Sequence, residues 1–160
     1  MKILFVCSSN ICRSPYAEFI FKRIVDNNEI LKKNITSVTS AAVFNNSKVI
    51  FDKTVTALVN EGFNRDDVIL HKPCYKSQVL PRFEDADVII GMSAIHKILT
   101  PRKYRKKFIT LSEAAIGKSL KIPDPFLIKS QERYDDIMDI IKTFLDLYSK
   151  NLIDSFSKNQ

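Results

Sequence analysis

The chain has 160 residues, of which 45% are hydrophobic and 27% are charged, so its composition excludes a disordered protein and fits one globular domain. Its formal net charge of +7 favours anionic partners such as phosphorylated molecules, although net charge alone gives no reason to expect a nucleic-acid partner. Three cysteines, an odd number, indicate reduced thiols and a cytoplasmic setting.

Apolar runs along the chain predict strands that alternate with helices. "KILFV" (2–6) is nearly all apolar, which is typical of a strand buried on both faces, and it is too short for a secretory signal. A helix should begin at Ser14 as its N-cap, with Pro15 in the first turn. Further strands are predicted at 35–40, 86–91 and 107–111, and further helices at 50–61, with Gly62 as its stop, and at 130–156.

This alternation predicts an α/β fold in a single domain, 1–160, with a four-stranded parallel sheet and helices on both faces. No segment reaches the length needed for membrane insertion. In folds of this class, ligands bind at the carboxyl ends of the strands. The loop at 7–14, "CSSNICRS", leaves the first strand at that edge, so its position makes it the candidate site.

The same loop carries residues that suit phosphate chemistry. A loop that enters a helix N-terminus presents unpaired N–H groups, and the fork of Arg13 can grip two oxygens of an oxyanion. This positive field favours the thiolate of Cys7, and Ser14 can donate a hydrogen bond to that sulfur. Each residue alone has an ordinary structural explanation. Their combination, with five residues between the cysteine and the arginine, predicts a functional loop.

"VCSSNICRSPYAE" (6–18) resembles the signature of the low-molecular-weight protein tyrosine phosphatases, and "TSAA", "ADVIIGM" and "PDPF" extend the resemblance along the chain. The family also includes arginine phosphatases and thioredoxin-coupled arsenate reductases. The resemblance implies hydrolysis of phosphotyrosine through a phosphocysteine at Cys7, with Arg13 as phosphate clamp and with no metal or other cofactor. It implies a phosphate-binding loop of Ser8, Ser9, Asn10, Ile11, Cys12 and Ser14, in which Asn10 maintains a strained shape, and a supporting network that includes Ser40 and His71.

Family membership also requires a general acid, and "IPDPF" (122–126) supplies Asp124. An Asp-Pro pair alone is ordinary turn chemistry, so this assignment rests on the family match and on the position after the fourth strand. Ile11 stands where the family's tyrosine phosphatases carry isoleucine and its arginine phosphatases carry threonine, and an apolar side chain suits an aromatic ring. Phe44 and Phe126 are expected as pocket walls, with core packing as the alternative. The expected partners are phosphotyrosine-containing proteins or small aryl phosphates, and we expect a monomer or weak dimer.

The sequence departs from the family pattern at a few positions. Ser9 replaces a glycine in the loop, and in "GMSAIH" (91–96) Ser93 and His96 replace the usual aspartate and asparagine. Only one aromatic residue, Phe126, follows Asp124 where many relatives have two tyrosines. None of these changes removes a residue that would bond to phosphorus or transfer its proton.

Other functions have less support. Arsenate reduction needs a relay of cysteines, but Cys74 is alone in the middle of the chain. A phosphoarginine phosphatase of the same fold remains an alternative, as does a non-catalytic phosphoprotein-binding module, which only Ser9 favours. A metal site built from Cys7, Cys12, His71 and Cys74 matches no zinc spacing. Cys12 is expected either to form a protective disulfide with an oxidised Cys7 or to be a small buried loop residue.

Overall fold

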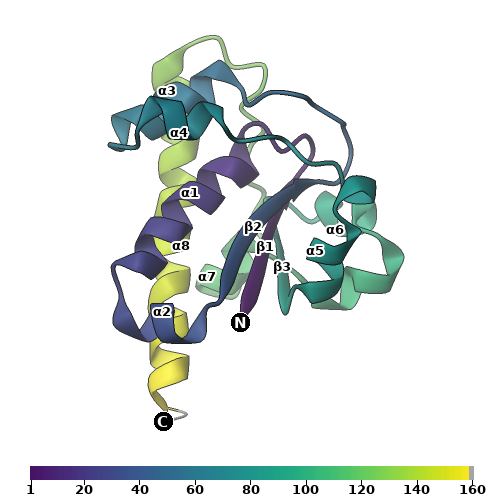
Figure 1. Cartoon of the computed structure of the whole chain (residues 1–160), viewed down its shortest axis with the longest axis vertical. Coiled ribbons are helices and arrows are strands. Elements are labelled where there is room, and N and C mark those ends of the chain that lie inside the picture. The colour runs from purple at the N-terminus through teal and green to yellow at the C-terminus, as the bar shows by residue number, and fades with distance from the viewer. Residues whose placement is uncertain (159–160) are drawn as a thin grey trace.

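The computed structural model describes residues 1–158 and contains a four-stranded parallel sheet in the order β2-β1-β3-β4 (Figure 1). The strands are β1 (Lys2–Cys7), β2 (Ser37–Ala42), β3 (Val88–Gly91) and β4 (Phe108–Thr110). This confirms the predicted single-domain α/β fold. The second strand begins two residues later than predicted. Cys7 is the last residue of β1, a central strand, so the loop that follows emerges at the carboxyl edge of the sheet.

Helices cover both faces of the sheet, as predicted. In Figure 1, α1 (Arg13–Asp26), α2 (Glu29–Asn34), α3 (Asp52–Asn60), α4 (Arg65–Ile69) and α8 (Gln131–Lys158) lie on one side, and α5 (Leu80–Asp85) and α6 (Ile95–Leu99) lie on the other. The chain also forms α7 (Leu111–Ile116), which packs against α8, and 3-10 turns at η1 (Lys76–Gln78) and η2 (Arg102–Lys107). No helix in 1–158 combines the length and apolarity needed to cross a membrane.

The central strand β1 is buried on both faces because its side chains alternate between two cores. Ile3 and Phe5 face the α1–α8 side, where the Phe5 and Phe21 rings meet edge to face at 5.7 Å. Leu4 and Val6 face the opposite core, together with Phe83. A continuous apolar run is what a strand in this position requires, since neither face meets water.

The start of α1 differs from the prediction. The helix begins at Arg13, Cys12 occupies the N-cap position without a side-chain cap, and Ser14 lies inside the first turn. Ser14 is therefore not the N-cap. Its hydroxyl is engaged by Asn10 and Cys7 instead, so an interaction across the loop prevails over local capping. The other predicted signals are confirmed: Pro15 lies in the first turn, and Gly62, with φ +90°, follows the end of α3.

Candidate active site

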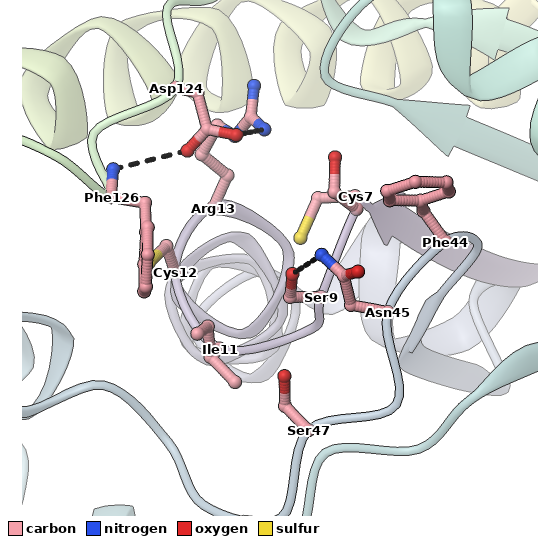
Figure 2. A pocket seen from close by; sticks show the side chains of 11 residues that line it. Cys7, Ser9, Ile11, Cys12, Arg13, Phe44, Asn45, Ser47, Asp124 and Phe126 are labelled. Atoms are coloured by element: carbon pink, nitrogen blue, oxygen red, sulfur yellow. Dashed lines mark hydrogen bonds and ion pairs between the residues drawn. The ribbon is translucent and has the colours of Figure 1, made fainter.

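Nine of the predicted site residues line one cavity of about 340 Å³ at the carboxyl end of β1, whereas Asn10, Ser14, Ser40 and His71 lie outside its lining. The loop after β1 forms its floor, and two further loops, after β2 and before α8, supply its sides (Figure 2). Its lining consists of Cys7, Ser8, Ser9, Ile11, Cys12, Arg13, Phe44, Asn45, Ser47, Asp124 and Phe126. Residues separated by more than a hundred positions in the sequence therefore meet at the carboxyl edge of the sheet, where the α/β topology predicts a ligand site.

Asn10 maintains the shape of the loop. Its φ of 56° lies in the left-handed region, and the residue is completely buried. Its side-chain amide donates to Ser14 Oγ at 2.9 Å and to Ser40 Oγ at 2.7 Å, while its Oδ1 accepts from the backbone N–H of Cys74 at 3.0 Å. These three hydrogen bonds offset a backbone conformation that costs roughly 1–2 kcal/mol for a residue other than glycine.

The carbonyl groups of the loop are bound from outside. The backbone N–H groups of 43–45 donate to the carbonyls of Cys7 and Ser8, and the N–H of Phe51 donates to the carbonyl of Ile11. His71 Nε2 lies 3.3 Å from the carbonyl oxygen of Asn10. Since the N–H of a trans peptide points opposite to its C=O, this arrangement leaves the N–H groups on the inner side of the loop, where they can bind an anion.

The sulfur of Cys7 lies 3.1 Å from Ser14 Oγ, and both residues are buried. Ser14 Oγ already accepts a hydrogen from Asn10, so its own hydrogen is available to the sulfur. The chain from Asn10 through Ser14 therefore directs a donor at Cys7 Sγ. A hydrogen bond of this kind stabilises negative charge on sulfur.

Arg13 and Asp124, which both line the cavity, form an ion pair with each other. Arg13 is 4% exposed, its Nη2 lies 2.7 Å from Asp124 Oδ2, and its Nη1 donates to the carbonyl of Ile122 at 3.1 Å. Its Nε is buried and has no hydrogen-bond partner within the described residues. A buried, unpaired N–H is costly, and an oxyanion bound in the cavity can satisfy it. The Asp124 side chain is half exposed at 50%, so it borders both the cation and solvent.

The apolar side chains of the cavity flank the sulfur. Figure 2 shows Phe44 and Phe126 on opposite sides of Cys7, with Ile11 in the lower part of the view. Phe44 and Phe126 are 62% and 51% exposed, so core packing does not account for them. Phe126 is steadied by the Phe51 ring, 5.4 Å away. The cavity therefore places three apolar side chains around the polar loop, beside the polar side chains of Asn45 and Ser47.

Three comparisons agree on what kind of protein has this site. The sequence profile of the family described as low molecular weight phosphotyrosine protein phosphatase matches residues 2–158. This chain belongs to that family. The low molecular weight protein-tyrosine-phosphatase PtpB of Staphylococcus epidermidis is 30% identical over 148 residues, which are 88% of this chain and 94% of the relative.

A second relative differs in substrate: the protein-arginine-phosphatase of Bacillus subtilis is 34% identical over 129 residues, or 79% of this chain and 80% of the relative. The solution structure of a low molecular weight protein tyrosine phosphatase from Bacillus subtilis is 30% identical and superimposes with a TM-score of 0.75, covering 95% of this chain and 97% of that one. The chain is therefore a hydrolase of this phosphatase family, and its relatives include both tyrosine and arginine phosphatases.

The phosphatase loop has a supporting network that includes both residues predicted for it. Ser40 Oγ accepts from Asn10 and donates to Glu18 Oε2 at 2.5 Å. His71 contacts the Asn10 carbonyl; burial lowers its pKa, and the negative charge of Glu18 opposes that shift. Glu18 was not predicted as a member of this network, although it is the last residue of the "VCSSNICRSPYAE" segment.

Other supports come from distant elements and were also missed. Thr54 Oγ1 donates to the Ile11 carbonyl at 2.7 Å and accepts from the Tyr134 hydroxyl at 2.7 Å. Ser9, the residue that replaces a glycine, accepts from Asn45 Nδ2 at 2.9 Å. Ser8 Oγ lies 3.3 Å from His96 Nε2. Local sequence gives no signal for these pairs because each joins segments at least 36 residues apart.

All three cysteines are free thiols. Cys12 is buried, and that burial raises its pKa to about 12. Cys74 does not line the cavity, and its thiol donates to the Lys72 carbonyl at 3.1 Å. Within residues 1–158 no group of His, Cys, Asp and Glu side chains is arranged to hold a metal ion.

Two substitutions of Asn10 separate the loop's hydrogen bonds from its backbone conformation. Asn10→Gly tolerates φ 56° but loses the three side-chain hydrogen bonds. We therefore expect its free energy of unfolding, measured in urea, to be lower by about 2–3 kcal/mol. Asn10→Ala loses the same bonds and adds backbone strain, so it should be less stable than Asn10→Gly by about 1 kcal/mol. Equal stability of the two variants would show that the left-handed conformation imposes no cost.

We predict that Cys12 protects an oxidised Cys7 by forming a disulfide with it. Peroxide converts the Cys7 thiolate to a sulfenic acid, and the Cys12 thiolate then attacks that sulfur and displaces hydroxide, which takes a proton from solvent to become water. Because the Cys12 pKa is raised to about 12, little thiolate exists at pH 7, and the rate of closure should increase with pH. After mild peroxide and then dithiothreitol, Cys12→Ser should recover far less activity than the unaltered protein. Equal recovery would contradict a protective role.

Proposed function

We propose that this protein hydrolyses phosphotyrosine in proteins, and small aryl phosphates, through a phosphocysteine intermediate on Cys7. One observation carries the proposal: Cys7, Arg13 and Asp124 line a single cavity that is also lined by Ile11, Phe44 and Phe126. The first three residues provide a nucleophile, an anion clamp and a proton donor. The others provide an apolar slot for a phenyl ring.

In the first step the phosphate group binds the inner N–H groups of the loop and the Arg13 guanidinium, and competes with Asp124 for Arg13. Cys7 Sγ attacks phosphorus, an S–P bond forms, and the P–O bond to tyrosine breaks. Asp124 gives its proton to the departing phenolate oxygen, which would otherwise leave with full negative charge. Its half-exposed position at the cavity wall suits contact with that oxygen.

The second step reverses the role of Asp124. The carboxylate takes a proton from a water molecule, whose oxygen attacks phosphorus while the S–P bond breaks and the electron pair returns to Cys7. The hydrogen bond from Ser14 stabilises the sulfur as it leaves. The products are inorganic phosphate and the free thiolate.

The apolar sides of the cavity favour tyrosine over arginine as the phosphorylated residue. A guanidinium carries several N–H donors that need acceptors; Ile11, Phe44 and Phe126 offer none, and the acceptors in the lining come from other residues, such as Asn45, Ser47 and Asp124. Phosphoarginine is the second candidate substrate, because a relative of similar identity is named a protein-arginine-phosphatase.

Arsenate reduction is disfavoured because Cys74 lies outside the cavity lining and has no second cysteine beside it. The free thiols agree with a cytoplasmic enzyme. One chain supplies the nucleophile, the anion clamp and the proton donor, which agrees with a monomer or weak dimer.

Replacing the nucleophile tests the function directly. We expect Cys7→Ser to reduce turnover of para-nitrophenyl phosphate by at least about 1,000-fold, because a neutral hydroxyl cannot replace a thiolate. Phosphate affinity, measured by calorimetry, should remain largely intact because the loop and Arg13 are unchanged. Turnover near that of the unaltered protein would exclude Cys7 as the nucleophile. Absence of turnover in the unaltered protein, with phosphate still bound, would favour the non-catalytic binding module.

The general acid is tested by comparing leaving groups. Asp124→Asn should slow phosphotyrosine turnover by about 100-fold or more, because tyrosine is a poor leaving group without a proton donor. The loss for para-nitrophenyl phosphate should be smaller, since its phenol is far more acidic. Equal losses for both substrates, or no loss for either, would exclude Asp124 as the proton donor.

Ile11 is tested as the selector between the two candidate substrates. Ile11→Thr replaces an apolar contact with a hydroxyl that can accept from a guanidinium, so the ratio of phosphoarginine to phosphotyrosine turnover should increase about tenfold. Ile11→Val provides the matched control, since it shortens the side chain without adding a hydroxyl. An unchanged ratio in Ile11→Thr, or an equal change in both variants, would show that this hydroxyl is not what selects the substrate.

A further inference from the structure

His96, at the start of α6, is almost completely buried beside the phosphatase loop, with 1% of its surface exposed. Its Nδ1 accepts a hydrogen bond from the backbone N–H of Met92 at 3.2 Å. Burial, and to a lesser extent the positive charge of Arg13, lower the pKa of His96 to about 4, so the ring is neutral near pH 7. A neutral ring that accepts at Nδ1 carries its hydrogen on Nε2.

The Nε2 hydrogen of His96 has a defined acceptor, Ser8 Oγ, at 3.3 Å. Ser8 follows Cys7 directly, and its carbonyl is held by the N–H groups of Phe44 and Asn45 at 3.0 and 2.8 Å. Both the backbone and the side-chain oxygen of Ser8 are therefore fixed. Because His96 acts as donor, the hydroxyl must direct its own hydrogen elsewhere, and Ser8 lines the cavity that contains Cys7 and Arg13.

We propose that the Ser8 hydroxyl donates to an oxygen of the bound phosphoryl group and that His96 is the positioning residue that orients it. The proposal deepens the proposed function and rests on it. The His96 ring donates to a lone pair of the hydroxyl, which leaves the O–H hydrogen free for the anion. The side chain of Ser8 thus adds a donor to those of the loop backbone and Arg13. An oriented donor costs no reorganisation when charge develops on the phosphoryl oxygens.

A purely structural role for His96 makes a different prediction. If the ring only fills space between α6 and the loop, its loss should lower stability and weaken anion binding regardless of what occupies position 8. If it acts through Ser8, its loss should have no further effect on binding once the Ser8 hydroxyl is gone. Double-mutant analysis of phosphate affinity distinguishes the two cases.

The test measures the dissociation constant of inorganic phosphate by calorimetry, together with kcat and KM for para-nitrophenyl phosphate and Tm, in the full chain. Ser8→Ala should weaken phosphate binding about fivefold to tenfold, the loss expected for one hydrogen bond to a charged group. His96→Leu should cause a similar loss, and combining it with Ser8→Ala should add less than about twofold. His96→Gln keeps an N–H donor and should recover part of the affinity.

Thr100→Val is the matched control for damage to α6. Thr100 is buried and its hydroxyl donates to the His96 carbonyl at 2.8 Å, so this change perturbs the same helix without touching the ring or Ser8. It should lower Tm while leaving the dissociation constant of phosphate unchanged. Unaltered phosphate binding in Ser8→Ala, or losses that multiply in the double variant, would overturn the proposal. Should His96→Leu fail to fold, Ser8→Ala and His96→Gln still decide it. Because phosphate binding needs no turnover, these results stay separate from failure of the proposed function, which the Cys7→Ser comparison would reveal.

Discussion

The left-handed backbone of Asn10 is the constraint on which the site depends. A loop that must curl around a small anion needs such a turn, and glycine is the usual residue for it. Here Asn10 takes that conformation, and its side chain links Ser14, Ser40 and the Cys74 backbone. The amide that secures the turn also sets the direction of the Ser14 hydroxyl toward Cys7. Loop shape and sulfur chemistry therefore share one set of hydrogen bonds.

The surroundings of the loop provide hydrogen-bond donors on its outside, which leaves the loop's own N–H donors on the inside. The loop's carbonyl groups accept hydrogen bonds from 43–45, Phe51, Thr54 and His71, so the N–H groups of these peptides point toward the cavity. Beyond the rim, Phe44 and Phe126 change the environment from polar to apolar over a short distance. This contrast suits a substrate that has a dianion at one end and a ring at the other.

The sequence alone identified the elements whose signals are local. The apolar run of β1, the spacing of Cys7 and Arg13, and Pro123 and Pro125 around Asp124 each lie within a few residues, and a resemblance to the family placed Ser40 and His71. Short helices such as α4 and α6 were missed because five residues are too few to show a helical period. Ser14 satisfied the local rule for an N-cap, but its tertiary hydrogen bonds outweighed that rule. Thr54, Tyr134 and His96 could not be assigned, since only the folded chain brings them to the loop.

The support that Tyr134 gives to Thr54, and through it to Ile11, has a consequence for biosynthesis. Cys7 leaves the ribosome more than a hundred residues before the general acid candidate and the helix that carries Tyr134. A nascent chain therefore holds its reactive sulfur through that interval without the groups that complete the pocket. Phosphatase activity should appear only after this helix has emerged and packed, which makes it a direct report of finished folding rather than of the presence of the loop.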